Sequence, residues 1–260
     1  MLDFKEISAK DNRIIKLTAL LQKSAKARKE NSLFVLEGLR ICRDAADCGV
    51  AFDTLIVSET ARKKHANDIE NFSKISNNGV LIPDYLFEKI SDTETPQGII
   101  ALAKIPDITV PVDKSGRYVA LEHIADPANL GAIARTAEAL GISGIIVSGD
   151  GCDIFSPKAL RASMGTLLRV PVYSCADITE FLKANSLRGF ACVPDANADL
   201  KIGETCFLPG DVVIIGNEAN GLTENTVKGA YKTVTIPMRG RAESLNAASA
   251  ASIAMWELLK

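Results

Sequence analysis

The chain reads YVALEHIADPANLGAIAR from Tyr118 to Arg135, and the fold of its second half follows from this stretch. Four of its first five residues are apolar, which predicts a buried strand at Tyr118–Glu122. An Asp-Pro pair ends the strand, and Asn129 is predicted as the N-cap of a helix that runs to Leu140. Arg135 falls on the second turn, away from the apolar side of that helix. A strand, a turn and a helix in this order form the unit from which parallel α/β sheets are built.

The same alternation of apolar strands and helices continues to the end of the chain. Continuous apolar strands separated by helices indicate a parallel sheet that is covered on both faces. Further strands are predicted at Gly144–Val147, Val170–Tyr173, Gly189–Val193, Val212–Ile215 and Thr233–Ile236. Helices are predicted at Pro157–Leu167, Ile178–Asn185 and Glu224–Ala230, with a last one after Leu245. Ligands of such sheets bind beyond the carboxyl ends of the strands, so the strand-end loops are the candidate sites.

Residues 1–104 are predicted to form a smaller α/β domain. Its expected elements are helices at Lys16–Lys29 and Glu37–Cys48 and strands at Phe34–Leu36, Thr54–Val57 and Gly98–Ala103. Residues 105–116 hold two prolines and end in Ser-Gly, a composition that predicts a linker. The second domain is then expected at 117–260.

The composition limits the classes of function. The formal net charge of −2 gives no overall electrostatic case for nucleic acid, so any RNA-binding surface must be local. A basic cluster lies near the N-terminus, and either it is a solvated helix face or it contacts phosphates. Its members are Lys10, Arg13, Lys16, Lys23, Lys26, Arg28 and Lys29. We see no secretory signal and no apolar run long enough to span a membrane, so a cytoplasmic protein is expected.

No metal site is expected. The six cysteines include no C-x-x-C pair, and the two histidines, His65 and His123, are far apart in the sequence. A zinc site needs four close ligands. The cysteines are therefore interpreted as small buried hydrophobic residues in a reducing compartment.

Three strand-end segments occur in a fixed order: NLGAIAR at 129–135, IIGNEANGL at 214–222 and IPMRGRAESLN at 236–246. Their order, spacing and placement resemble the three motifs of the SpoU family, also called the TrmH family, of RNA ribose 2′-O-methyltransferases. The first part of the chain is similar too. FVLEG at 34–38 and TPQG at 95–98 resemble positions in the substrate-binding domain that precedes many members.

The resemblance implies a fold and a reaction. It implies an α/β protein with a small N-terminal L30e-like domain, followed by a knotted parallel-sheet SPOUT methyltransferase domain. It implies S-adenosylmethionine as the methyl donor, a homodimer with the site at the two-fold interface, and an RNA substrate, with 23S-type rRNA favoured over tRNA. By position, Gly216, Ile236 and Leu245 match the residues that contact the cofactor. The catalytic residues implied are Arg135, Asn129, Glu218, Ser244 and Asn246.

The role of Arg135 has two interpretations. The resemblance implies a base, whereas a free guanidinium is protonated at neutral pH. We favour an electrostatic role, in which the arginine holds a phosphate and stabilises the developing alkoxide.

Two other classes of function were weighed. A nicotinamide-dependent dehydrogenase would need G-x-G-x-x-G, but Gly149 and Gly151 are followed by Ile154 where the third glycine should be. An RNA-binding protein with a dead site is disfavoured because all five polar residues of the motifs are present.

Overall fold

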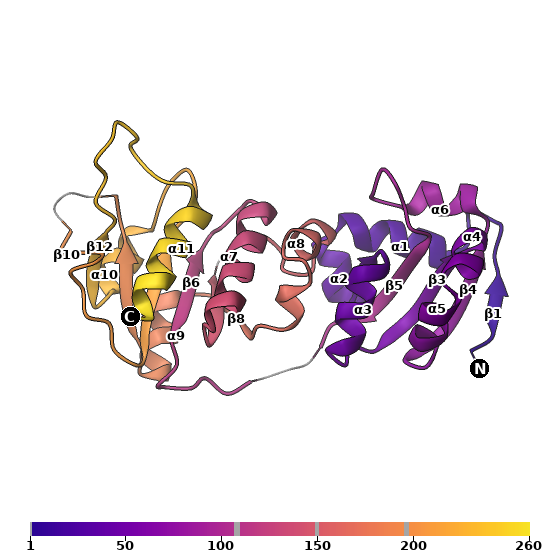
Figure 1. Ribbon diagram of the computed structural model, residues 1–260, viewed down its shortest axis with the longest axis horizontal. Helices are drawn as coiled ribbons and strands as arrows, with labels where there is room; N and C mark the ends of the chain where they lie inside the picture. Colours follow the sequence, from indigo (N-terminus) through magenta and orange to yellow (C-terminus); the bar gives the residue numbers. More distant parts are fainter. Residues whose placement is uncertain (1, 107–109, 149–150, 195–197) are drawn as a thin grey trace. The chain divides into compact units, whose positions relative to one another are not determined.

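The structure is a computed structural model that describes residues 2–106, 110–148, 151–194 and 198–260. Its contacts group into two units, each built on its own sheet (Figure 1). Unit 1 comprises Met1–Ile108 and Asp153–Leu168, and unit 2 comprises Thr109–Cys152 and Arg169–Lys260. The segment Asp153–Leu168, which the sequence assigned to the second domain, thus groups with unit 1, and the domain ranges stay predictions. Residues 107–109 of the expected linker and Gly149 of the dehydrogenase-like turn lie outside the described residues.

Unit 1 contains a mixed five-stranded sheet in the order β1-β4-β3-β5-β2. Strands β1, β3 and β4 run parallel, and β5 is antiparallel to both β3 and β2. The strands are β1 (Phe4–Glu6), β2 (Leu33–Glu37), β3 (Phe52–Ser58), β4 (Ser76–Ile82) and β5 (Ile99–Lys104). The helices are α1 (Arg13–Lys23), α2 (Ala25–Asn31), α3 (Leu39–Asp47), α4 (Glu59–Lys64), α5 (Ala66–Ser73) and α6 (Asp84–Ile90).

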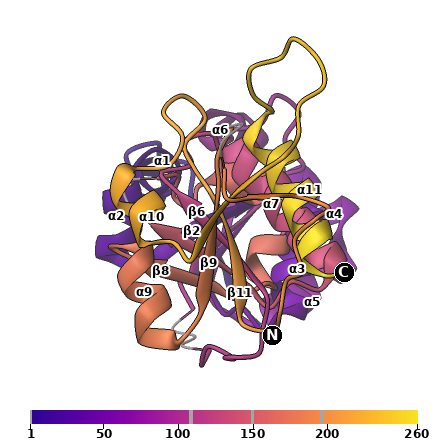
Figure 2. The ribbon, with the colours of Figure 1, turned by 90° about the vertical axis from the view of Figure 1, so that its left-hand side faces the viewer.

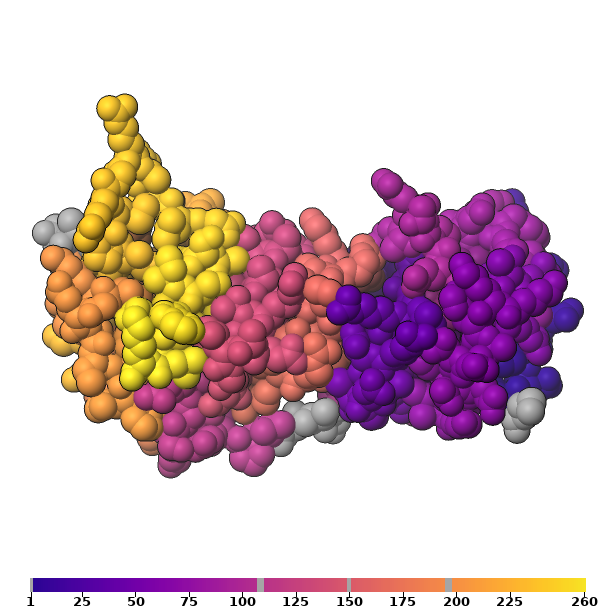
Figure 3. Space-filling model, in the orientation of Figure 1, coloured from indigo at the N-terminus to yellow at the C-terminus, as the bar shows by residue number. Residues whose placement is uncertain are grey.

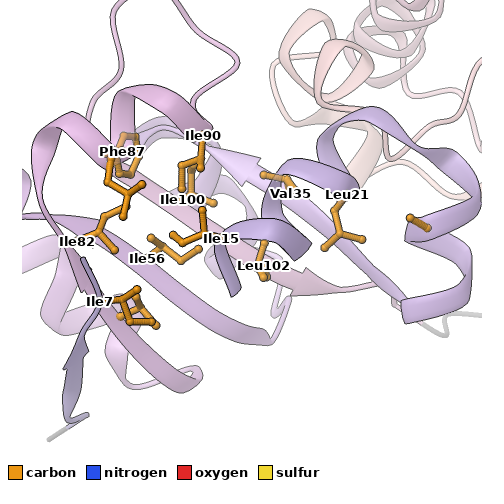
Figure 4. Packing of buried hydrophobic residues seen from close by; sticks show 13 residues of the cluster. Ile7, Ile15, Leu21, Val35, Ile56, Ile82, Phe87, Ile90, Ile100 and Leu102 are labelled. Carbon is orange, nitrogen blue, oxygen red and sulfur yellow. The ribbon is translucent and has the colours of Figure 1, made fainter. Parts of the chain in front are cut away.

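One face of this sheet is covered by α1, α2 and α6. Their apolar side chains interlock with alternate residues of β2, β3, β4 and β5 in a single buried cluster (Figure 4). Ile15 of α1 and Phe87 of α6 meet Ile56 and Ile100 of the sheet there. Burial of this apolar surface supplies most of the driving force for folding of the unit.

The predicted helix Lys16–Lys29 is two helices in the structure. The Ser24 hydroxyl accepts a hydrogen bond from the Ala27 amide, 3.2 Å away, and so caps a new helix. The break turns Arg28 inward, where its side chain is 5% exposed. Arg28 donates to the backbone oxygens of Leu21 and Gln22 and pairs with Asp153 at 2.7 Å.

The segment Asp153–Leu168 contains α8 (Pro157–Ala162) and the short 3-10 helix η1 (Thr166–Leu168), where one helix was predicted. Between α8 and η1, Met164 and Gly165 both adopt positive φ, a backbone conformation that ends α8. The Phe155 ring lies 4.9 Å from that of Phe34 in β2, and Arg161 pairs with Asp92. These contacts explain why the segment groups with unit 1.

Unit 2 contains a seven-stranded sheet in the order β10-β12-β9-β11-β6-β7-β8, and every pairing is parallel. The strands are β6 (Tyr118–Glu122), β7 (Gly144–Ser148), β8 (Val172–Cys175), β9 (Arg188–Cys192), β10 (Leu200–Lys201), β11 (Asp211–Ile215) and β12 (Lys232–Thr235). The helices α7 (Pro127–Leu140) and α11 (Ala247–Leu258) cover one face, and α9 (Ile178–Asn185) and α10 (Glu224–Gly229) cover the other (Figure 2). The predicted doubly covered parallel sheet is confirmed.

The strand order reverses at one point. From β6 the chain builds outward through β7 and β8, and then β9, β11 and β12 are added on the other side of β6. The connections that leave β6 and β11 therefore diverge, which opens a crevice at the carboxyl ends of these two central strands. After β12 the chain returns across this edge to α11, which packs on β11 and α7. The knot stays a prediction from the resemblance.

The start of α7 differs from the prediction in a way that matters for the site. Asp126, not Asn129, is the N-cap: its carboxylate accepts from the Ala128 amide at 2.9 Å, and proline occupies the first helical position. Asn129 lies inside the first turns, and it is buried. None of the helices within the described ranges has the length and hydropathy needed to cross a membrane.

Candidate active site

A cavity of about 470 Å³ lies at the carboxyl ends of β9, β11 and β12. Three chain segments form its wall: the end of β9, the loop after β11 and the connection between β12 and α11. Gly216, Glu218, Ile236, Ser244 and Leu245, all predicted from the sequence, line it. The remaining lining residues are Cys192, Val193, Pro194, Ile215, Asn217, Ala219, Asn220, Gly221, Leu222, Val234, Thr235, Met238, Glu243, Ala247 and Ala250.

The loop 216–222 is a tight closed turn. The backbone amides and carbonyls of Asn217 and Gly221 bond each other at 2.9 and 3.0 Å. A Cβ on Gly216 would lie 2.2 Å from the carbonyl carbon of Gly221, so only glycine permits this closure. Gly216 therefore shapes the cavity wall through its lack of a side chain.

Glu218 connects this loop to the turn between β6 and α7. Its carboxylate accepts from Asn129 Nδ2 at 2.8 Å and from the amides of Ala125 and Asp126 at 3.2 and 3.3 Å. Asn246 Nδ2 in turn donates to Asn129 Oδ1 at 2.9 Å. The first, second and third motifs thus meet in one hydrogen-bonded chain, Asn246–Asn129–Glu218.

The hydrogen bonds determine the charge state of Glu218. Partial burial raises the pKa of this carboxyl. The hydrogen bonds from Asn129 and from backbone amides lower it by more than burial raises it, so the net pKa is below the ordinary range of a glutamate. Glu218 is therefore an ionised acceptor at neutral pH. A carboxylate that stays ionised can orient donors or face a cation, but it does not supply a proton.

The connection between β12 and α11 is the most exposed wall of the cavity. Residues 237–246 are all exposed, and this connection stands out from the surface of unit 2 in the space-filling view (Figure 3). Asn246 is the N-cap of α11, because its Oδ1 accepts from the amides of Ala248 and Ser249. Capping accounts for the oxygen of Asn246, and the bond to Asn129 accounts for its nitrogen.

Arg135 does not line the cavity. It is exposed on α7, and in the described part of the chain no hydrogen bond or ion pair holds it. Its neighbour Thr136 has its hydroxyl 3.2 Å from that of Ser252 on α11. The structure therefore brings together seven of the eight predicted residues and leaves Arg135 apart, exposed on α7.

Sequence reasoning missed two parts of the site. Cys192, Val193 and Pro194 follow β9, and the rule that ligands bind at strand ends would have included them. Asn217 lies within the second motif, and the resemblance implied no role for it. Its side chain organises that loop, since Oδ1 accepts from Ala219 and Asn220 and Nδ2 donates to the His123 carbonyl at 2.9 Å.

The described residues contain no cluster of three or more histidine, cysteine or acidic side chains arranged to hold a metal ion. Burial raises the pKa of the Cys42 thiol to about 12, so this cysteine is an inert part of the core.

Two family models match the chain. Residues 116–256 match the SpoU rRNA methylase family, and residues 11–101 match the MRM3-like substrate binding domain. The chain belongs to the SpoU rRNA methylase family. The first match covers the cavity and its three loops, and the second covers most of unit 1.

Relatives and solved structures agree with this membership. The chain is 26% identical to the 23S rRNA (guanosine(2553)-2′-O)-methyltransferase RlmP of Bacillus subtilis, over 98% of this chain and 99% of that protein. It is 33% identical to the 23S rRNA (uridine(2479)-2′-O)-methyltransferase of Streptomyces viridochromogenes, over 69% of this chain and 66% of that protein. A crystal structure of an AdoMet-bound rRNA methyltransferase from Sinorhizobium meliloti superposes with a TM-score of 0.85 and 28% identity, covering 98% and 97% of the two chains.

Family membership confirms several predictions from the sequence. The α/β fold class with a SPOUT-type parallel sheet, the methyltransferase class and S-adenosylmethionine as cofactor are confirmed. The assignment of individual residues to catalysis stays a prediction.

Proposed function

We propose that this protein transfers a methyl group from S-adenosylmethionine to a ribose 2′-hydroxyl of structured RNA, with 23S-type rRNA favoured over tRNA. The observation that carries the proposal is the cavity at the carboxyl ends of β9, β11 and β12, joined to the Asn246–Asn129–Glu218 chain by Glu218 in its wall. Transfer would exchange the sulfur–methyl bond of the cofactor for an oxygen–methyl bond on the ribose, with S-adenosylhomocysteine as the leaving group and the hydroxyl proton released to solvent water. The relatives named as 23S rRNA 2′-O-methyltransferases support the substrate class.

The cavity suits the cofactor in size and chemistry. Its volume lies within the usual range for small-molecule sites. Leu222, Ile236 and Leu245 offer apolar surface for an adenine ring, and the carboxylates of Glu218 and Glu243 are complementary to a cationic ligand. The cofactor, when bound, supplies an electrophilic methyl group on a positively charged sulfur.

The chain's own residues position the reactants. Gly216, Ile236 and Leu245 bind the cofactor, while Asn129, Glu218, Ser244 and Asn246 orient polar groups at the cavity rim. Arg135 holds an RNA phosphate beside the reacting ribose and stabilises the alkoxide as it forms. Orientation of this kind removes much of the barrier to an in-line transfer.

The substrate RNA binds in part to unit 1. On α1, Arg13, Lys16 and Lys23 are exposed and spaced three, then seven residues apart, so they share one helix face. Exposed Leu20 lies on the same face. Among the residues that the structure describes, an acidic partner is seen, of these three cations, only for Lys16, which pairs with Asp11 at 3.1 Å. A stripe of this kind contacts phosphates without reading sequence. Because the proposed substrate is rRNA, we propose a cytoplasmic enzyme.

The active form is a homodimer. Helix α11 exposes Trp256 and Ile253, which are 57% and 37% accessible, beside α7. Exposed large apolar side chains on a paired helix surface favour burial against a second copy. Because Arg135 is exposed on α7 and lies outside the cavity of its own chain, we place it at the cavity of the partner protomer.

The test is a methyl-transfer assay on rRNA that lacks the modification, followed by mapping of 2′-O-methyl positions. The expected result is one ribose methylated in an S-adenosylmethionine-dependent reaction. Binding of S-adenosylmethionine and RNA without any transfer would support the alternative of a dead site. Methylation of a base would contradict the proposed reaction.

A further inference from the structure

Glu122 is a buried carboxylate that none of the sequence motifs includes. It ends β6 at the point where the strand order reverses, between β11 and β7, and it is 5% exposed. Burial of an ionised carboxyl is costly unless hydrogen-bond donors surround it. No ion pair with a basic side chain is seen for Glu122 within the described ranges, so its donors must be uncharged.

Within the described residues, the hydrogen-bond donors to Glu122 all lie at the start of α10. The Thr223 amide donates at 2.7 Å to one carboxylate oxygen of Glu122, and the Thr223 hydroxyl donates at 3.0 Å to the other. The hydroxyl of buried Thr226 donates to that second oxygen as well. Thr223 is also the N-cap of α10. Glu122 therefore fastens the start of α10 to the end of β6.

Thr223 directly follows the loop 216–222 of the cavity wall. The other attachments of this loop also lead to the segment after β6, since Asn217 donates to the His123 carbonyl and Glu218 accepts from the Ala125 and Asp126 amides and from the Asn129 side chain. Of these, the bonds with backbone atoms are exposed, whereas the bonds that Glu122 accepts from Thr223 are partly buried and the bond from Thr226 is buried. Glu122 is the anchor at the end of the loop, where Thr223 and Thr226 follow residue 222, whereas Asn217 and Glu218 hold its beginning.

We infer that Glu122 is the positioning residue of the cofactor cavity, which holds the loop 216–222 in its binding shape through Thr223 and Thr226. The inference rests on the proposed function only in taking S-adenosylmethionine as the ligand of that cavity. Glu122 does not line the cavity and touches no reacting group. Its loss should therefore weaken cofactor binding while leaving the chemical step at saturating cofactor nearly unchanged.

The experiment compares Glu122→Ala and Glu122→Gln with a matched control, Glu37→Ala. Glu37 is likewise a buried carboxylate, 8% exposed, that accepts from one backbone amide, two hydroxyls and the Gln22 side-chain amide, but it lies in unit 1. Calorimetry should show the Kd for S-adenosylmethionine raised about tenfold in Glu122→Ala, less in Glu122→Gln, which keeps one acceptor oxygen, and not at all in Glu37→Ala. Single-turnover rates at saturating cofactor should stay within a few-fold of the parental rate.

A second measurement needs no cofactor. Amide hydrogen exchange of residues 217–223 should quicken in both Glu122 variants and stay at the parental rate in Glu37→Ala. If Glu122→Ala does not fold, Glu122→Gln and Thr226→Val, which removes only one hydroxyl donor, replace it under the same criteria. A parental Kd in the Glu122 variants, or an equal rise in Glu37→Ala, would overturn the inference. If the parental protein itself bound no S-adenosylmethionine, the proposed function would fail, and the exchange rates alone would decide on Glu122.

Discussion

Arg135 is the residue on which the proposed chemistry most depends. Arg135→Ala is expected to leave the Kd for S-adenosylmethionine within a few-fold, because Arg135 does not line the cavity of its own chain and is proposed to hold RNA, not the cofactor, at the partner's. The rate of methyl transfer should fall by on the order of 10², the usual loss for one electrostatic stabiliser. Arg135→Lys should recover little, since an ammonium cannot reproduce the planar fork of donors. The measurements are calorimetry and single-turnover transfer with saturating RNA.

The matched control for Arg135 is Lys183→Ala, which removes another exposed helical cation from unit 2. Alanine favours helix at both positions, so neither change should unfold the protein. Transfer at the parental rate by Arg135→Ala would remove this residue from the mechanism. A proportional loss of cofactor binding would give it a structural role instead.

Glu218 should show its lowered pKa in the pH dependence of stability. A carboxyl whose folded pKa is lowered contributes stability above its unfolded pKa and loses it as the pH falls through the folded pKa. The difference in Tm between the parental protein and Glu218→Gln should therefore stay constant from about pH 8 into the mildly acidic range and shrink only in stronger acid. Thermal melts across this range measure it. A difference that shrinks near neutral pH would contradict an ionised Glu218.

At the scale of elements, the basic face of α1 predicts a particular salt dependence of RNA binding. Arg13→Glu and Lys23→Glu should each weaken binding to matched and unmatched RNA alike, because phosphate contacts carry no sequence information. Each lost contact should reduce the slope of log K against log salt by about 0.7–0.9. Filter binding over a salt series gives both quantities.

The control for the α1 face is Lys183→Glu, the same change of charge on α9 of unit 2. It tests whether net charge alone weakens binding. Equal losses from all three variants would show that α1 is only a solvated helix face, the other interpretation of this cluster.

At the scale of the whole molecule, a site shared between two copies can be tested by mixing inactive variants. Arg135→Ala and Glu218→Ala should each be inactive alone if Arg135 serves the partner's cavity. After subunit exchange at equal amounts, half of the dimers are mixed, and each has one intact site. Activity should then recover to about a quarter of the parental value. No recovery in a proven mixed dimer would place Arg135 with its own cavity.

The dimer itself depends on the exposed face of α11. Trp256→Glu should convert the protein to a monomer in light scattering and abolish transfer, because it places a charge where apolar surface is expected to be buried. Glu257→Gln, on the same helix, is the control and should leave the mass unchanged. A parental protein that is monomeric at micromolar concentration and fully active would contradict the dimer.

The sequence by itself determined the parallel sheet of unit 2 and most of its cavity. Strands such as Val212–Ile215 are apolar throughout, and a run of this kind can only be buried between two layers of helices. Gly216, Ile236 and Leu245 followed from the motifs at strand ends, and all three line the cavity. In unit 1 the strands β1 and β4 were missed, because Phe4–Glu6 and Ser76–Ile82 mix polar and apolar residues without a clear period.

Only the tertiary structure decided the roles that depend on side chains far apart in the sequence. Asn129 is a residue type that often caps helices, yet Asp126 caps this helix. Asn129 instead lies buried and donates to Glu218, 89 positions later in the sequence. Glu122 gave no signal as the last residue of an apolar strand, and its donors, Thr223 and Thr226, are about a hundred residues away. Local propensity depends on neighbouring residues, whereas the partner of a buried polar group is set by how distant strands are ordered in the sheet.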